Sequence, residues 1–324
     1  MRARYGALIL LTAGISLVAL SLFLGSKTIT PSGMARLFIE GPGSVDYAIV
    51  VGLRLPRILL ALVIGASLAV SGTVLQSVLK NPLADPYIIG VSGGAALGAT
   101  VAIVSRGGPG VVAAAAFAGS LVSITGVFLL SKKMRLGTTG LILSGIALGF
   151  IFSSAVMLIY ALSRSDQIHR AMLWLMGDLS GARYDMLKGL GILSLILVMA
   201  AMAFHRHLDI ISMGDRFSRS LGVTALDVGA LFWIASLLAA LAVSLVGVVG
   251  FVGLIVPHVM RNIFGPSHLR LIPASAAGGA IFLLISDSIG RSIAPPFEIP
   301  VGIITGFLGG AFFLVHMIRR ETGR

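Results

Sequence analysis

The 324-residue sequence contains no cysteine and few charged residues, and each shortage excludes a class of protein. Without cysteine, the chain forms no disulfide and no thiolate metal site. Its cysteine content therefore does not indicate whether the protein faces an oxidising or a reducing compartment. Charged residues make up 11% of the sequence, whereas a soluble globular protein carries roughly a quarter. Since 57% of the residues are hydrophobic, too little polar surface remains to cover a soluble fold. The chain is therefore an integral membrane protein.

Acidic residues are also scarce, at 12 against 24 lysines and arginines, so the formal charge is +12. A basic excess can indicate nucleic-acid binding, but here the basic residues stand singly between apolar runs and do not cluster with aromatic residues. Membrane topology explains this distribution better, and we expect no nucleic-acid partner. The 41 glycines suit helices that approach closely in lipid.

Apolar runs of bilayer length predict an all-α membrane protein, a polytopic bundle of about ten transmembrane helices in a single domain over residues 1–324. The first run also fits a signal peptide, but residues 24–26 form a poor cleavage site and more spans follow, which favours a transmembrane helix. The run from Leu226 to Phe264 is about twice the length of one span, so we expect a turn near 247–253. The other expected spans are 5–24, 57–79, 88–104, 111–130, 139–162, 189–204, 272–290 and 301–318.

The distribution of lysine and arginine orients the ten spans. With both termini in the cytoplasm, 14 of the 24 basic residues face inward, including the cluster at 131–135, the segment 205–222 and the tail 319–324. Residues 27–50 and 163–187 then lie outside. Two five-helix halves would have opposite orientations, an inverted repeat that is common in transporters.

Two strings give the sequence its most specific signature. The stretch Arg54–Gly98 reads R-L-P-R, about twenty apolar residues, K-N-P-L-A-D-P and G-V-S-G-G-A-A-L-G, which predicts a membrane hairpin. The string G-F-V-G-L-I-V-P-H at 250–258 contains Pro257, which implies a kinked or broken helix. Over nearly the whole chain, the sequence resembles the FecCD-type permeases of ABC importers, the type II family that takes up iron-siderophores, haem and cobalamin.

The resemblance implies a homodimeric permease in the cytoplasmic (inner) membrane of a bacterium or archaeon, with a translocation pathway between the two copies. Two copies of a separate ABC ATPase would bind ATP and Mg²⁺, an external substrate-binding protein would deliver a metal chelate, and lipid would surround the spans. We expect no enzyme activity and no cofactor in this chain itself. The string G-S-K-T at 25–28 has Ser21 where a phosphate-binding loop needs glycine, so it does not predict ATP binding.

The segment 205–222 is the longest polar island on the predicted cytoplasmic side. Its helix-forming residues between two glycines predict a short amphipathic helix, which could simply lie at the membrane surface without a partner. Its sequence is similar to the family motif L-G-E-x-x-A-R-x-L-G, which docks on the ATPase. The resemblance assigns ATPase coupling to Gly214, Asp215, Arg216, Ser218, Arg219, Leu221 and Gly222, with Asp215 in place of the family's common glutamate and Ser218 in place of its alanine.

Three arginines stand at predicted outer ends of spans: Arg54, Arg57 and Arg291. Single arginines there usually anchor a helix at the interface. The resemblance implies instead that the three guanidinium groups pair with acidic residues of the external binding protein, from an exposed rim. Asp287 precedes Arg291 by four residues, so an intrahelical ion pair is the alternative for Arg291.

The prolines of N-P-L-A-D-P predict a turn whatever the function. The resemblance adds that this loop and the one near residue 138 line a cytoplasmic gate, formed by Asn81, Leu83, Thr138 and Thr139. His258 stands without metal-ligating partners nearby in the sequence, so we expect a histidine packed in the bundle and no metal site.

The main alternative is an ion- or proton-coupled secondary transporter, which would need intramembrane carboxylates. Asp287 is the only carboxylate deep enough to be considered, and it stands near a span end. A membrane enzyme is disfavoured because the spans contain no cluster of histidine, aspartate or glutamate. The sequence does not distinguish siderophore, haem and cobalamin as the substrate.

Overall fold

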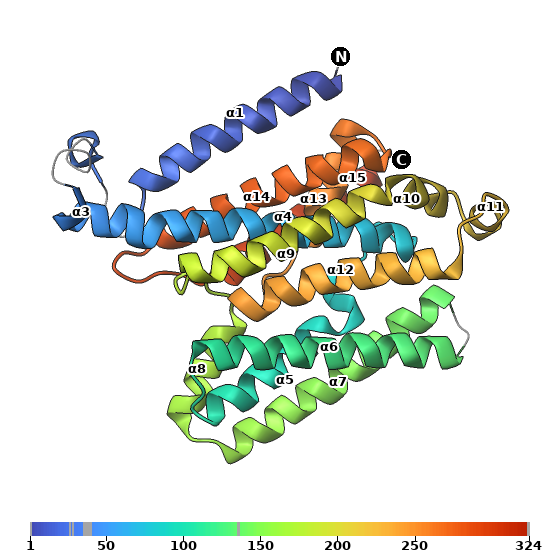
Figure 1. The fold of residues 1–324 in the computed structure, drawn as a ribbon, viewed down its shortest axis with the longest axis horizontal. Coiled ribbons are helices and arrows are strands. Elements are labelled where there is room, and N and C mark those ends of the chain that lie inside the picture. Colours follow the sequence, from blue (N-terminus) through green and yellow to red (C-terminus); the bar gives the residue numbers. More distant parts are fainter. Residues whose placement is uncertain (1, 26, 28, 35–40, 135–136, 323–324) are drawn as a thin grey trace.

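The computed structural model describes residues 2–25, 27, 29–34, 41–134 and 137–322, and they form a bundle of helices without a β-strand (Figure 1). Residues 35–40, 135 and 323–324, which belong to the predicted outer loop and cytoplasmic set, lie outside the described residues. The elements in chain order are α1 (Arg2–Phe23), η1 (Gly41–Gly43), α3 (Val45–Tyr47), η2 (Ala48–Arg54), α4 (Leu55–Val78), η3 (Pro86–Ile89), α5 (Val91–Val104), α6 (Pro109–Met134), α7 (Gly137–Leu162), α8 (Ser165–Leu175), α9 (Tyr184–Ala203), α10 (His205–Ser212), α11 (Asp215–Ser220), α12 (Ala225–Val246), α13 (Val252–Phe264), α14 (His268–Ser292) and α15 (Val301–Thr322).

Every predicted span corresponds to a helix. In the described part of the chain, seven helices are long and apolar enough to cross a bilayer, and α5, α13 and α15 contain shorter apolar helices. The predicted turn near 247–253 is confirmed, because α12 ends at Val246, α13 begins at Val252, and Gly247 and Phe251 between them have positive φ angles. The inverted relation of the two halves stays a prediction.

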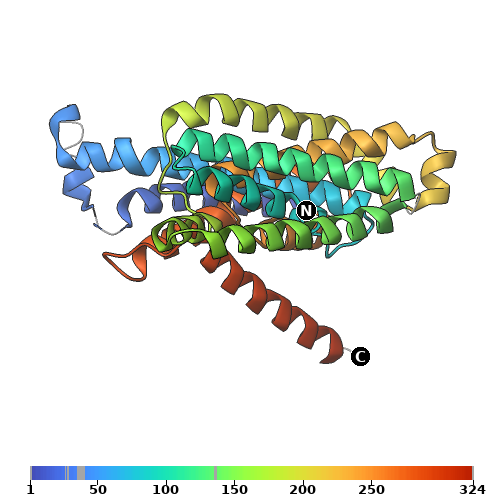
Figure 2. The same ribbon diagram turned by 90° about the horizontal axis from the view of Figure 1, so that it is seen from below.

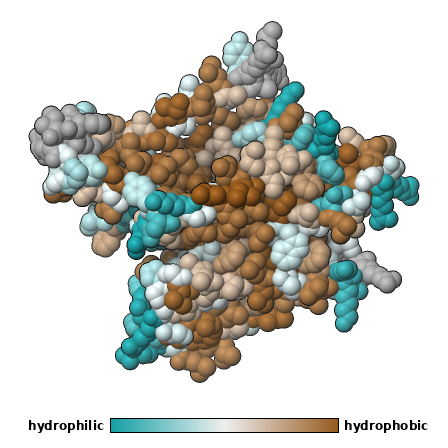
Figure 3. All heavy atoms as spheres, viewed as in Figure 1, coloured by the Kyte–Doolittle hydropathy of each residue, from teal (hydrophilic) through white to brown (hydrophobic). Residues whose placement is uncertain are grey.

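Most of the long helices run along the longest axis of the molecule, so α3 and α11 lie at opposite ends (Figure 1). The face seen in Figure 3 is mainly hydrophobic between these ends, and its hydrophilic residues gather toward them. Following the predicted topology, we call the α3 end the outer end and the α11 end the inner end.

The second span begins earlier than expected. The sequence predicted a helix from residue 57, but α3, η2 and α4 form one helical segment from Val45 to Val78. Pro56 does not end it: the proline is the second residue of α4, directly after the π-helical η2, and the helical segment continues through it. Arg54 and Arg57 therefore lie within a helical segment and not at the tip of one.

Helix α4 is the centre of the bundle and packs against α9, α12, α13 and α14. Glycines allow its closest approaches: a Cβ added to Gly65 would lie 2.2 Å from the carbonyl oxygen of Gly279 in α14, and one added to Gly72 would lie 1.8 Å from that of Gly253 in α13. Small residues of this kind let helices meet in lipid, where water does not drive their association. Nearly the whole of α4 from Ser67 to Val78 is buried as a result.

The start of α15 is tied to the other half of the bundle by backbone hydrogen bonds. The N–H groups of Val301 and Gly302 donate to the carbonyls of Gly177 and Met176, each at 3.1 Å, and Asp178 N–H donates to the carbonyl of Val246 at 2.8 Å. Beyond this junction α15 swings away from the other helices (Figure 2). It packs on α13 and α14 and leaves Phe307, Leu314 and Val315 exposed.

Replacing Gly72 with alanine should destabilise the bundle, because the added methyl group would overlap the backbone of α13. We expect a loss of about 1–3 kcal/mol or more in the free energy of unfolding, measured by unfolding of purified protein in detergent. Gly229→Ala is the matched control, since its Cβ would lie 3.8 Å from Phe128, an ordinary contact distance. Equal stability of the two variants would contradict the close approach of α4 and α13.

Candidate functional site

The inner end is built from the predicted coupling segment 205–222, which contains two helices where one was expected. The predicted helix between the glycines is α11, and its flanking residues Gly214 and Gly222 have φ angles of 113° and 85°, which favour glycine. Helix α10 precedes it and buries Leu208 and Ile211 while packing on α4 and α14. The tip is therefore a helix that projects from the bundle (Figure 1), joined to one that is anchored in it.

The exposed surface of the tip combines apolar and basic side chains. Met213, Phe217 and Leu221 are exposed at intervals of four residues, and the side chain of Phe217 is 62% exposed. Arg216 and Arg219 are exposed beside them. The sequence reading included the two arginines and Leu221 but missed Met213 and Phe217, although their four-residue spacing was visible in the sequence.

One of the predicted coupling residues is part of the packing of the tip, and another, Asp215, is the first residue of α11. Ser218 is buried; its backbone N–H donates to the carbonyl of Gly214, and its carbonyl accepts from the N–H of Val223, both at 2.9 Å. Ser218 therefore faces the protein and not an external partner.

A network of ion pairs lies at the outer end. The Nε of Arg57 donates to Oδ1 of Asp287 at 2.9 Å, and its Nη1 lies 2.6 Å from Oε2 of Glu298. The Nε of Arg291 lies 3.0 Å from Oδ2 of Asp287, and its Nη2 donates to the hydroxyl of Ser21 at 2.7 Å. Two guanidinium groups thus balance two carboxylates, and the network joins α1, α4, α14 and the segment before α15. The side chain of Asp287 is only 1% exposed, and a carboxylate buried to this extent needs nearby positive charges to offset the loss of its hydration.

The expectation that the arginines stand on an exposed rim is wrong. Arg54 is buried and donates to the backbone carbonyls of Leu22, at 2.6 Å, and of Lys27. Arg291 is buried as well, in the intrahelical pair with Asp287 that was the alternative. The side chain of Arg57 is 12% exposed. Because the helix continues outward past Arg54, it and its partners cover the three guanidinium groups.

The loop that was predicted to line the gate is anchored beneath the break between α12 and α13. Oδ1 of Asp85 accepts the N–H of Tyr87 at 2.9 Å, and the Tyr87 hydroxyl accepts the N–H of Val249 at 3.2 Å. Burial raises the pKa of the Asp85 carboxyl to about 6. Sequence reasoning did not single out the Asp85 carboxyl, which is half-buried in this loop.

The predicted gate residues occupy two separate places in the chain. Oδ1 of Asn81 accepts the N–H of Leu83 at 2.9 Å, which fixes the turn that the prolines predicted. The exposed Leu83 borders a small cavity together with residues of α13 and α15, which include His258 and Phe312. Thr138 and Thr139 lie in the first turn of α7. Their role as a gate stays a prediction.

His258 packs in the bundle as expected. Its ring meets that of Phe312 edge-on, with centroids 6.0 Å apart. Within the described ranges, no group of three histidine, cysteine, aspartate or glutamate side chains could hold a metal ion.

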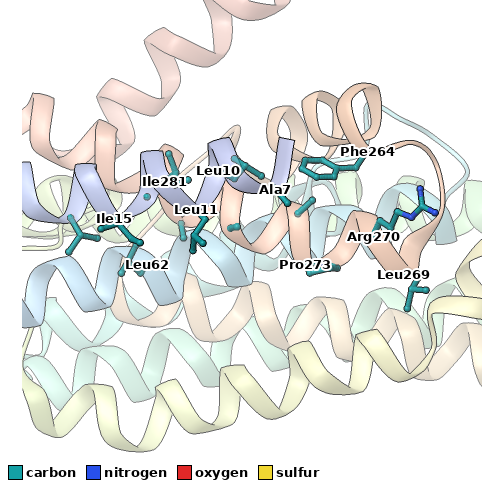
Figure 4. A pocket seen from close by; sticks show the side chains of 15 residues that line it. Ala7, Leu10, Leu11, Ile15, Leu62, Phe264, Leu269, Arg270, Pro273 and Ile281 are labelled. Carbon is teal, nitrogen blue, oxygen red and sulfur yellow. The ribbon is translucent and has the colours of Figure 1, made fainter. Parts of the chain in front are cut away.

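A cavity of about 1020 Å³ lies along α1, between that helix and α4, α13 and α14 (Figure 4). Leu11 and Ile15 of α1 line it, as do Leu62 of α4 and Ile281 of α14, and Arg270 is the one charged residue among those that border it. The cavity includes none of the predicted gate residues. Its place beside α1, at the edge of the bundle in Figure 1, sets it apart from the predicted gate.

Comparisons with known proteins agree over the full length of the chain. A model of the FecCD transport family matches residues 10–319. The hemin transport system permease protein of Yersinia pestis is 38% identical over 84% of this chain and 84% of that protein. The Fe(3+)-citrate import system permease protein of Bacillus subtilis is 36% identical over 95% and 92%, respectively. A solved inward-facing metal-chelate type ABC transporter matches with a TM-score of 0.85 at 28% identity, covering 98% of this chain and 99% of that one.

Removing the central carboxylate of the outer network should be costly. Asp287→Leu leaves two buried guanidinium groups against one carboxylate, so we expect a loss of about 3–5 kcal/mol in unfolding free energy. The double variant Asp287→Leu/Arg291→Met should be more stable than the single one, because Arg57 and Glu298 then balance each other. Lys27→Met is the control, since it breaks an exposed pair with Asp46 that contributes at most about 1 kcal/mol. Asp287→Leu as stable as the control would refute the network.

Proposed function

Since the chain belongs to the FecCD transport family of ABC importer permeases, we propose that the tip formed by α10 and α11 docks on the ATPase that powers transport. The observation that supports this most directly is the exposed apolar and basic surface of α11. Met213, Phe217 and Leu221 would sit outside the membrane with no cover, which is typical of a surface that meets another protein. Arg216 and Arg219 add charges that can orient the partner.

The transported substrate is proposed to be a metal chelate. The relatives are named for hemin, for ferric citrate and, in a cobalamin permease of Halobacterium salinarum that is 41% identical over 84% of this chain and 74% of that protein, for cobalamin. Membership in this family excludes the alternative that the chain is an ion- or proton-coupled secondary transporter. The geometry agrees, because Asp287 is ion-paired with both Arg57 and Arg291.

A second copy of the chain is proposed to cover α7 and α15. Helix α15 stands away from the bundle (Figure 2), and Phe307 and Leu314 on it are exposed. Helix α7 is also mostly exposed, with Phe150 and Met157 among its uncovered apolar side chains. A two-fold dimer through these helices would enclose the translocation pathway between the copies. Asn81, Leu83, Thr138 and Thr139 are proposed to close that pathway on the cytoplasmic side.

The outer end is proposed to receive the external binding protein. Val45, Ile293 and Phe297 are exposed there, next to the ion-pair network. In this proposal Arg54, Arg57 and Arg291 act by fixing the outer segments on which the partner sits. ATP and Mg²⁺ are proposed to bind two copies of the ATPase subunit, and lipid acyl chains to fill the cavity along α1.

Replacing an exposed aromatic and an exposed basic residue of the tip with acidic residues should strongly weaken ATPase binding. Phe217→Asp combined with Arg219→Glu alters two exposed side chains, so the membrane domain should stay folded. We expect the affinity of purified permease for its ATPase to fall by roughly thirtyfold or more, since an anchoring aromatic residue contributes about 2 kcal/mol or more. Arg164→Glu, at an exposed position of the outer end, is the control. Normal ATPase affinity in the double variant would exclude the tip as the docking surface.

The proposed location is the cytoplasmic membrane, with both termini in the cytoplasm. Single cysteines report topology cleanly because the chain has none of its own. Cysteine at the exposed positions Lys132 and Ser220 should react with a membrane-impermeant maleimide only after the cells are permeabilised, whereas Arg164→Cys should react in intact cells. Labelling of Lys132→Cys from outside alone would reverse the assignment.

A further inference from the structure

Three polar residues from distant parts of the chain meet at the inner end of the bundle. His268, the first residue of α14, is 2% exposed, and its Nδ1 lies 2.7 Å from Oδ1 of Asp209 in α10. Its Nε2 lies 2.7 Å from the hydroxyl of Ser77 in α4. The same Asp209 oxygen also accepts the backbone N–H of His268 at 2.8 Å. One histidine therefore joins α10, α14 and α4.

This arrangement has the order of an acyl-transfer triad, but it is not one. Ser77 is buried in the middle of the helix packing, and its hydroxyl is also within 3.2 Å of the carbonyl of Thr73. A nucleophile has to be offered to a substrate beside donors that stabilise an oxyanion. The cluster instead satisfies its own polar atoms: Nδ1–H donates to the carboxylate, and the serine hydroxyl donates to Nε2 or, if that nitrogen bears a proton, to Thr73.

Asp209 also takes the place of a cap for α14. The N-cap residue Ser267 provides no side-chain hydrogen bond to the first turn. The carboxylate of Asp209 supplies the acceptor from another helix, and its negative charge is favourable beside the positive end of the α14 dipole. These hydrogen bonds hold α10 in one position and orientation relative to the start of α14. The apolar contacts of Leu208 and Ile211 alone would allow a wider range of positions.

The location of the cluster gives it a mechanical consequence. Helix α10 is connected to the projecting α11 by Met213 and Gly214. Helices α4 and α14, which it contacts, are joined again at the outer end by Arg57 and Asp287 and in between by Gly65 and Gly279. A displacement of the tip would therefore move α4 and α14, which are held together along their length.

We propose that Asp209, His268 and Ser77 form a positioning link that transmits movement of the tip to α4 and α14. This inference rests on the proposed docking of the ATPase at the tip. Asp209 and His268 touch neither substrate nor nucleotide in this account; they make α10 and the α4–α14 pair move together.

Asp209 offers a matched pair of variants. Asp209→Asn keeps an oxygen acceptor for both N–H groups of His268, whereas Asp209→Leu removes it. The permease is assembled with its ATPase in nanodiscs, and amide hydrogen exchange is measured with and without a non-hydrolysable ATP analogue and Mg²⁺. In wild type and Asp209→Asn, nucleotide should alter exchange both at the tip, 213–222, and at the start of α14.

In Asp209→Leu, the nucleotide response at the tip should persist, while the response at the start of α14 should fall at least about tenfold. The reason is that the variant loses hydrogen bonds to a charged group, and their loss weakens the connection between α10 and α14 by at least this factor. An undiminished response at α14 in Asp209→Leu would overturn the link. Absence of any nucleotide response at the tip in wild type would instead contradict the proposed ATPase docking, so the two failures are distinguishable.

Two further variants keep the result clear. Should Asp209→Leu fail to fold, Ser77→Ala removes the contact from His268 Nε2 to α4 together with the hydrogen bond to Thr73. The nucleotide response at the inner end of α4 should then fall, and an α4 response equal to wild type would refute the role of the serine in the link. Asp227→Leu is the control for a cap lost at the same end, because the hydrogen bonds of Asp227 are to Thr224, at the start of its own helix α12. It should leave the α14 response unchanged.

Discussion

The pairing of α4 with α14 is the contact on which the other features of this permease depend. Midway along the two helices, Gly65 and Gly279 let the two backbones touch, which closely packed membrane helices achieve only with small residues. At the outer end Arg57 and Asp287 join the same helices by charge, and at the inner end Ser77 and His268 join them by a hydrogen bond. Three contacts of different chemistry thus fix the relative position of the pair over its whole length.

The surfaces of the transporter are arranged around this fixed pair. Its inner end supports α10 and the projecting α11, on which Phe217 is exposed, and its outer end supports the segments near Phe297. Helix α15 contacts α13 and α14 and then stands away from the bundle (Figure 2), where the proposed second copy would cover it. An importer of this design needs its helices to move relative to one another. In this structure the α4–α14 pair is closely packed, whereas α7 and α15 are more exposed.

Periodicity and length in the sequence were sufficient for the ten expected spans, including the division of 226–264, and for the helix between Gly214 and Gly222, but not for α8, α10 or the extension of the second span to Val45. They could not reveal the contacts between distant residues. The outer arginines were expected to be exposed because the second span was predicted to begin at residue 57. The helical segment instead continues from Val45, and Arg57 and Arg291 turn inward to Asp287. Asp209 and His268 lie far apart in the chain, and no pattern within either segment indicates that α10 caps α14.

The most direct test of this account is a structure of the complete transporter, with the chain, its second copy and the ATPase, determined without nucleotide and with a bound ATP analogue. The account predicts that Phe217 is buried against the ATPase in both states and that α4 and α14 keep the relative position seen here while α15 and α7 change theirs. An ATPase docked elsewhere on the inner end, or an α14 that slides along α4 between the two states, would contradict it.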